Sequence, residues 1–90
     1  MITVINNEQN QQFLAPIEDE TAYMEYRLKD GIIYLMHTDV PDRLSGKGIG
    51  TALATYAFNY ARENGLKVKV YCPFVLTYLK RHPELANIVA

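Results

Sequence analysis

The 90-residue sequence contains only one cysteine and two histidines, and it has no excess of charge of either sign. Cys72 alone cannot form an intramolecular disulfide, and with two histidines it cannot complete a structural zinc site, so no metal site is expected. Nine Lys and Arg side chains against ten Asp and Glu give a net charge of −1. This balance offers no electrostatic basis for binding nucleic acid or an anionic membrane.

The sequence also lacks any hydrophobic run long enough to span a membrane. Residues 1–9 have neither the basic start nor the apolar run of a signal peptide, so we expect a cytoplasmic protein. About half of the residues are hydrophobic (49%), which predicts a single domain over residues 1–90 with a modest core. Because so small a core is marginal alone, we expect a ligand-binding monomer or a weak homodimer.

The first half of the sequence has the patterns of short strands joined by tight turns. The predicted strands are residues 2–6, 11–17, 21–28 and 32–40. Pro16 makes the second an edge or bulged strand. Period-two alternation in the third places Leu28 on the buried face, together with Ala22, Met24 and Tyr26. Asp30-Gly31 predicts a hairpin turn, and the fourth strand, apolar on both faces, is placed centrally.

The second half changes to helical spacing. Apolar residues recur from Ile49 to Ala61, and Asn64-Gly65 supplies the helix stop. Residues 66–72 alternate again as a strand, and Pro73 begins a second helix over 74–82. The predicted order is β-β-β-β-α-β-α. This is a mixed α/β (α+β) fold, an antiparallel meander followed by one right-handed parallel crossover in a central twisted sheet.

The most informative motif is PDRLSGKGIGTAL, residues 41–53, in which Gly46, Gly48 and Gly50 precede the first helix. Glycines let successive backbone N–H groups turn inward, and a helix N-terminus adds positive potential, so such a loop suits a phosphate group. Lys47 can add a positive charge. A tightly packed turn without a ligand is the structural alternative.

Two common phosphate loops do not fit this motif. A Walker A loop would need glycine at Pro41 and a hydroxyl side chain at Gly48. A dinucleotide fingerprint would need glycine at Thr51 and an acidic residue about 20 positions on, but residues 66–78 contain none. Both readings are therefore excluded.

RLSGKGIGTAL resembles instead the pyrophosphate loop of the GCN5-related N-acetyltransferases, whose pattern is Q/R-x-x-G-x-G/A. Arg43, Gly46 and Gly48 match this pattern literally. A second register, which places Ser45, Gly48 and Gly50 there, keeps the usual distance to Leu53, and we prefer it. His-Thr-x-Val-Pro before the loop, and Cys-Pro-Phe-Val and Arg-His-Pro after it, resemble the small family of minimal, stand-alone GCN5-like acetyltransferases.

The resemblance implies an acetyl-CoA-dependent N-acetyltransferase that acts on an unidentified amine, with coenzyme A (CoA) or acetyl-CoA as cofactor. It places the acetyl group near His37 and Cys72. The implied cofactor-binding residues form two segments of the chain. They are Thr38, Asp39 and Val40 at the end of the central strand, and Gly46, Lys47, Gly48, Ile49, Gly50 and Thr51 in the loop.

Two side chains have the chemistry for acyl transfer. His37 falls in phase with Ile33 and Leu35, and imidazoles can act as general bases at neutral pH. Cys72 ends a strand just before a helix, a position that favours a reactive thiolate, and it could accept the acetyl group or line the acyl site. The structural alternatives are a half-buried histidine and a buried, unreactive cysteine.

Apart from Ser45, which stands at the Q/R position of the loop in the second register, two positions depart from the family pattern. The resemblance would place Asn at the end of the second-half strand and a Tyr general acid seven residues later, whereas this chain has Cys72 and Leu79 there. We therefore keep two alternatives. One is a module that binds CoA or acyl-CoA without turnover, and the other is an interaction protein that retains only the fold.

Overall fold

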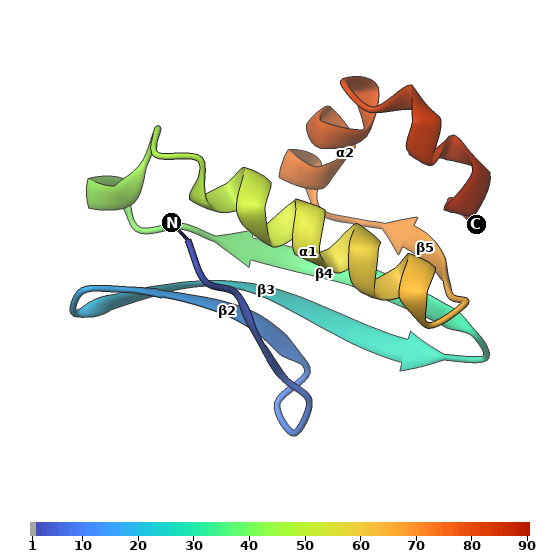
Figure 1. Cartoon of the computed structure of the whole chain (residues 1–90), viewed down its shortest axis with the longest axis horizontal. Coiled ribbons are helices and arrows are strands. Elements are labelled where there is room, and N and C mark those ends of the chain that lie inside the picture. The colour runs from blue at the N-terminus through green and yellow to red at the C-terminus, as the bar shows by residue number, and fades with distance from the viewer. Residues whose placement is uncertain (1) are drawn as a thin grey trace.

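The computed structural model describes residues 2–90 and is built on a five-stranded sheet with strand order β1-β2-β3-β4-β5 (Figure 1). Its strands are β1 (Ile5–Asn7), β2 (Gln12–Ile17), β3 (Glu20–Lys29), β4 (Ile32–Asp39) and β5 (Lys67–Val70). Its helices are α1 (Ile49–Glu63) and α2 (Pro73–Lys80), with short 3-10 helices η1 (Asp42–Leu44) and η2 (Pro83–Ile88). Neighbouring strands are antiparallel except β4 and β5, which are parallel and joined through α1. The predicted fold class and element order are confirmed.

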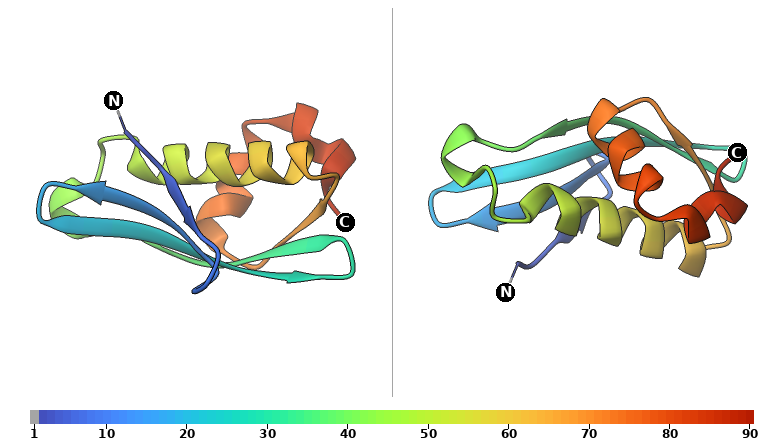
Figure 2. Two further views of the ribbon diagram at one scale, coloured as in Figure 1. Left: turned by 60° about the horizontal axis from the view of Figure 1, so that its bottom comes forward. Right: turned by 90° about the horizontal axis from the view of Figure 1, so that it is seen from above.

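Helix α1 crosses one face of the sheet, as both views of Figure 2 show, and α2 packs against α1 and β5. The core lies between α1 and the sheet. From the strands it takes the fully buried Phe13, Ala15, Ala22, Met24, Tyr26, Ile33, Leu35 and Val68. From α1 it takes Leu53, Ala54, Ala57, Phe58 and Ala61. The alanines at helical spacing let the helix approach the sheet closely.

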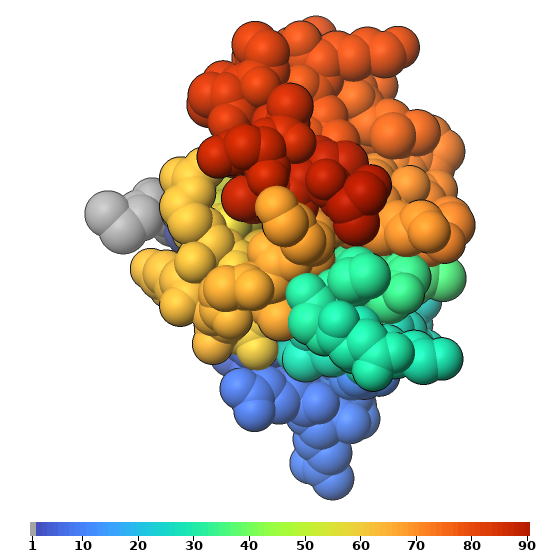
Figure 3. All heavy atoms as spheres, turned by 90° about the vertical axis from the view of Figure 1, so that its right-hand side faces the viewer, coloured from blue at the N-terminus to red at the C-terminus, as the bar shows by residue number. Residues whose placement is uncertain are grey.

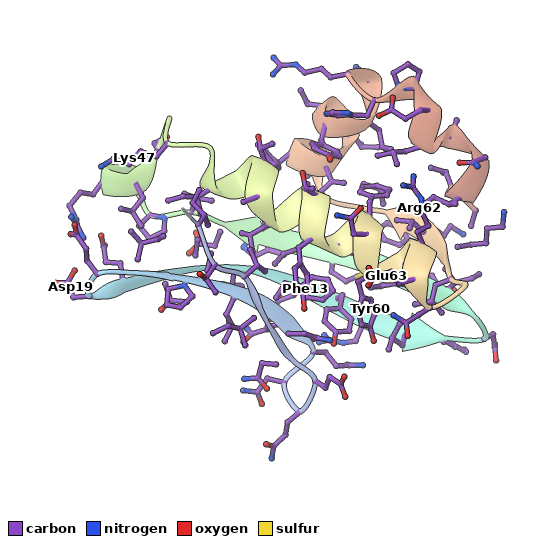
Figure 4. The ribbon with its side chains drawn as sticks, viewed as in Figure 1. Phe13, Asp19, Lys47, Tyr60, Arg62 and Glu63 are labelled. Carbon is purple, nitrogen blue, oxygen red and sulfur yellow. The ribbon has the colours of Figure 1, made fainter. Side chains whose placement is uncertain are left out.

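An aromatic cluster occupies one side of this core. The Phe13 ring stacks on Tyr26 with 4.4 Å between centroids, and it meets Tyr56 and Tyr60 edge-on at 5.2 and 5.6 Å. Phe13 and Tyr60 lie side by side beneath α1 in Figure 4. The Tyr26 hydroxyl donates a 2.6 Å hydrogen bond to Asn6 Oδ1, and burial raises the pKa of Tyr26.

The C-terminal residues close the end of the sheet beside β5. Val89 bridges to Val68, and the Ala90 amide donates a 2.7 Å hydrogen bond to the Val68 carbonyl. The Lys67 ammonium donates to the Asn87 carbonyl at 2.8 Å. Figure 3 shows this segment, in red, lying over the end of α1 and beside β5. The outer edge of β5 is thereby partly covered.

Three strand assignments and one helix end from the sequence are wrong in detail. The first strand begins at Ile5 rather than residue 2. The second is not an edge strand, because β1 pairs with it on one side and β3 on the other. However, β1 pairs only with residues 12–14, so Pro16 lies beyond that pairing, where a missing N–H is tolerated. The strand predicted over 66–72 is shorter, and α2 ends at Lys80.

A β-bulge interrupts β4. Leu35 lies opposite Tyr26 and His37 lies opposite Glu25, so Met36 is an extra residue in β4. Beyond it Thr38 pairs with the buried Met24 and takes the inward-facing position. The expectation that His37 is in phase with Ile33 and Leu35 is therefore wrong. His37 is exposed on the opposite face of the sheet.

Leu28 was also assigned to the buried face, but 42% of its surface is exposed. The reason is its position along β3. β2 pairs with β3 only from Glu20 to Glu25, so the far end of β3 has no neighbouring strand on that side. Alternation identified the face correctly for Ala22, Met24 and Tyr26, but it cannot show where the partner strand stops.

We expect Phe13→Ala to lower the free energy of unfolding by about 3–5 kcal/mol, because it removes a buried ring and leaves a cavity. Leu28→Ala serves as the contrast and should change it by only about 0.5 kcal/mol, as for other exposed sites. Urea denaturation of both variants measures the difference. A loss of several kcal/mol in Leu28→Ala would place Leu28 in the core after all.

Candidate functional site

The glycine-rich loop connects η1 to α1. Gly46 and Gly48 have φ angles of +79° and +78°, the left-handed region that side-chain-bearing residues avoid. Gly48 is the N-cap of α1, and a Cβ added at Gly46 or Gly48 would meet no atom within 4 Å. The first amides of α1 have no partner within the helix. These amides therefore border open space at the positive end of a 15-residue helix.

Gly50 is required in the loop for a different physical reason, namely packing. A Cβ at Gly50 would lie 2.7 Å from Cζ of Phe74, at the start of α2. The alternative of a tightly packed turn therefore describes Gly50, whereas Gly46 and Gly48 are required by backbone conformation. The two helices meet at this contact.

A hollow of about 280 Å³ lies outside the loop. It is lined by Val40, Leu44, Ser45, Gly46, Gly48, Ile49, Gly50, Thr51 and Phe74. Six of the nine residues predicted to bind the cofactor are among them; Thr38, Asp39 and Lys47 are not. Phe74 and Leu44 were not assigned to the site from the sequence. Phe74 comes from α2, and only the contact with Gly50 reveals its role in shaping the hollow.

Arg43, the first residue of the literal loop motif, points away from the hollow. Its guanidinium contacts the acidic turn between β2 and β3, with Nε 2.7 Å from Glu20 Oε2 and Nη2 3.0 Å from Asp19 Oδ1. Hydrogen bonds to the carboxylates of Glu18, the largest cause, and Glu20 raise the pKa of Arg43. Ser45 does line the hollow, which favours the second register. Lys47 lies at the same end of the molecule as Asp19 (Figure 4).

Strand β4 has an unpaired stretch next to this loop. In the described residues, β5 pairs with β4 only as far as Leu35, where the Tyr71 amide donates to the Leu35 carbonyl at 2.9 Å. The chain then turns at Pro73 into α2. Because the bulge restores the inward phase at Thr38, the backbone N–H and C=O of Thr38 point to the side that β5 has left. An open strand edge thus leads towards Val40 and the hollow.

Cys72 and His37 lie on opposite faces of the sheet. Cys72 is the N-cap of α2 and is only 4% exposed, and its thiol donates a 3.1 Å hydrogen bond to Thr38 Oγ1. His37 is exposed on the outer face, with its ring 6.0 Å from that of Tyr23. Glu25 is the cross-strand partner of His37. The structure brings Cys72 to Thr38 but does not bring it into contact with His37.

Tyr78 and His82 belong to the packing of α2. The Tyr78 hydroxyl lies 3.0 Å from Thr55 Oγ1, and its ring stacks on Phe58 with 5.7 Å between centroids. His82 stacks on Tyr78 at 4.3 Å, and its Nδ1 lies 3.1 Å from Glu84 Oε2. Tyr78 therefore already uses its hydroxyl group between the two helices.

Residues 2–90 contain no group of three His, Cys, Asp or Glu side chains that could hold a metal ion. Within the same residues, no helix combines the length and the apolar character needed to cross a membrane.

In this α+β fold, an unpaired edge of β4 lies beside a glycine-rich helix N-terminus. This combination suits an extended ligand that carries phosphate. The family model of the GCN5-related N-acetyl-transferases matches residues 12–88. The chain belongs to this family.

Individual relatives agree with this membership. Protein NATD1 of Mus musculus is 32% identical over 85 residues, which cover 91% of this chain and 77% of the mouse protein. Protein NATD1 of Homo sapiens is 38% identical over 52 residues, which cover 58% of this chain and about half (46%) of the human protein. A GCN5-like protein from Staphylococcus aureus, solved by NMR, superimposes with a TM-score of 0.75 at 27% identity. That alignment covers 98% of this chain and 87% of the solved one.

We expect Cys72 to react with iodoacetamide more slowly than a free thiol at pH 7. This is contrary to what its place before a helix suggests, because alkylation of a 4% exposed side chain requires local opening. Thr38→Ala, which removes the hydrogen-bond acceptor and leaves space beside the sulfur, should speed the reaction. Alkylation of the unmodified protein at the rate of a free thiol would contradict the buried, hydrogen-bonded arrangement.

Proposed function

We propose that this chain binds acetyl-CoA and transfers its acetyl group to an amine. The observation that carries the proposal is the unpaired edge of β4 at Thr38, which runs into the loop of Gly46 and Gly48. The pantetheine arm is an extended chain with amide groups, so it can add to Thr38, Asp39 and Val40 as a further strand. The pyrophosphate would then meet the amides of Gly48–Thr51, with Lys47 supplying charge.

The acyl group would lie where β4 and β5 separate. Thr38 and Cys72 are joined there by their hydrogen bond on the inner face of the sheet, and His37 lies on the outer face of β4. An amine that arrives from the outer face would meet His37, with Glu25 and Asp39 exposed or half-buried beside it. The two carboxylates would attract a protonated amine, which loses one proton to solvent to become nucleophilic, and the imidazole would take the second proton as the amide forms.

In the reaction, the neutral amine nitrogen attacks the carbonyl carbon of the thioester. The carbon–sulfur bond breaks, the amide forms, and the CoA sulfur leaves as a thiolate that takes up a proton. The proton lost by the amine goes to His37. We propose direct transfer rather than an acetylated Cys72, because the Cys72 thiol is buried and hydrogen-bonded to Thr38.

One observation favours the alternative of a CoA-binding module without turnover. Cys72 and Leu79 stand where the family pattern has Asn and a Tyr general acid, and the Tyr78 hydroxyl lies 3.0 Å from Thr55 Oγ1. The leaving thiolate would then have to take its proton from solvent. The two functions share the same cofactor site, so binding and turnover are tested separately.

Binding is tested by comparing two glycines of equal backbone conformation. Gly48 and Gly31 both have φ of +78° and open space around the missing Cβ, but only Gly48 lies in the loop. Both Ala variants should lose about 1–2 kcal/mol of stability through left-handed strain. Only Gly48→Ala should weaken CoA binding in a calorimetric titration, by about tenfold or more, because its methyl group blocks the approach of the pyrophosphate. Equal CoA affinity in the two variants would refute the loop as the pyrophosphate site.

Turnover is tested with His37→Ala and Cys72→Ala. Loss of a general base should lower kcat by about 100-fold in His37→Ala while acetyl-CoA affinity is kept, and Cys72→Ala should be mild. Mass spectrometry after incubation with acetyl-CoA should find no acetyl mark on the protein. A thioester on Cys72 that an amine discharges would overturn direct transfer. If no amine is acetylated by the unmodified protein, the CoA-binding module is the better account.

A further inference from the structure

A second, smaller hollow of about 100 Å³ lies between α1 and α2. It is lined by Thr51, Phe74, Thr77, Tyr78, Arg81 and His82. Thr51 and Phe74 also line the hollow at the glycine-rich loop, so the two hollows adjoin across these side chains. A ligand held at the loop therefore has this second hollow as its neighbour along the molecular surface.

The second hollow contains a cationic side chain, Arg81, that is available to a ligand. No ion pair within residues 2–90 engages Arg81, whereas Arg43 is held by three carboxylates of the β2–β3 turn. Glu84 is the acidic group near this hollow, and its carboxylate is 3.1 Å from Nδ1 of His82. The Arg81 guanidinium is thus available for an anion, and Thr51 adds a hydroxyl group at the junction.

We propose that this hollow binds the 3′-phosphoadenosine end of CoA and that Arg81 contacts the ribose 3′-phosphate. The inference rests on the proposed function, since it begins from a pyrophosphate at the amides of Gly48–Thr51. The ribose follows the pyrophosphate directly in CoA, so it falls near Thr51, and its 3′-phosphate needs a nearby cation. Phe74 is 42% exposed at the junction, so its ring is accessible for stacking with the adenine.

The arrangement gives Arg81 a role in ligand selectivity. A guanidinium binds phosphate through charge-assisted hydrogen bonds, which are stronger than those between neutral groups. The chain should therefore prefer CoA to 3′-dephospho-CoA, which keeps the pyrophosphate, the pantetheine arm and the adenine but lacks the 3′-phosphate. The loop alone would not distinguish these two ligands.

The test is a calorimetric titration of CoA and 3′-dephospho-CoA into the unmodified protein, Arg81→Gln and Lys80→Gln. The unmodified protein should bind CoA about tenfold more tightly than 3′-dephospho-CoA. This factor is the scale of one hydrogen bond to a charged group. Arg81→Gln should reduce this ratio to about twofold or less by weakening CoA binding alone. Lys80→Gln is the matched control. It removes the same charge from the same helix end, and Lys80 lines neither hollow, so the ratio should stay at about tenfold.

The remaining outcomes separate this inference from the proposed function. Equal binding of both ligands by the unmodified protein overturns the role of Arg81 and leaves the loop site intact. An unchanged ratio in Arg81→Gln, or an equal fall in Lys80→Gln, also overturns it, because the preference would then arise elsewhere or from overall charge. If neither ligand binds the unmodified protein, the proposed function fails together with the inference.

Discussion

The extra residue Met36 in β4 controls which way the end of this strand faces, and the candidate site depends on that. Ile33 and Leu35 face the core before the bulge, and Thr38 faces it afterwards. Thr38 can therefore accept the hydrogen bond from Cys72, while His37 turns to the outer face. Because β5 stops pairing at Leu35, the same stretch of β4 keeps an open edge. In a strand without the bulge, His37 would face the core and Thr38 would face outward.

The loop and the helices complete the site through backbone conformation and close packing. Gly46 and Gly48 supply left-handed turns, and Gly50 lets the Phe74 ring approach α1. The cationic side chains near the site have separate roles. Arg43 is held by the acidic β2–β3 turn, which reduces the negative field of that turn beside the loop. Lys47 and Arg81 are the cations that our account assigns to the ligand.

Much of the fold could be predicted because periodicity reports burial directly. Alternation located β3 and β5, helical spacing located α1, and Pro73 marked the start of α2. Met36 could not be identified as a bulge, because it lies in a run that is apolar at every position and so carries no period-two signal. Because the bulge was not foreseen, His37 was wrongly placed in phase with Ile33 and Leu35. Phe74 was missed because its contact with Gly50 joins residues 24 positions apart in the sequence.

The most direct test of the central claim is amide hydrogen exchange, followed by NMR, with and without saturating acetyl-CoA. If the pantetheine arm adds to the open edge of β4, the Thr38 amide gains a hydrogen-bond partner and its exchange slows. The amide of Tyr71, which already donates to the Leu35 carbonyl, should change little. Bound acetyl-CoA that leaves the exchange of Thr38 unchanged would contradict the account, because the ligand would then lie elsewhere.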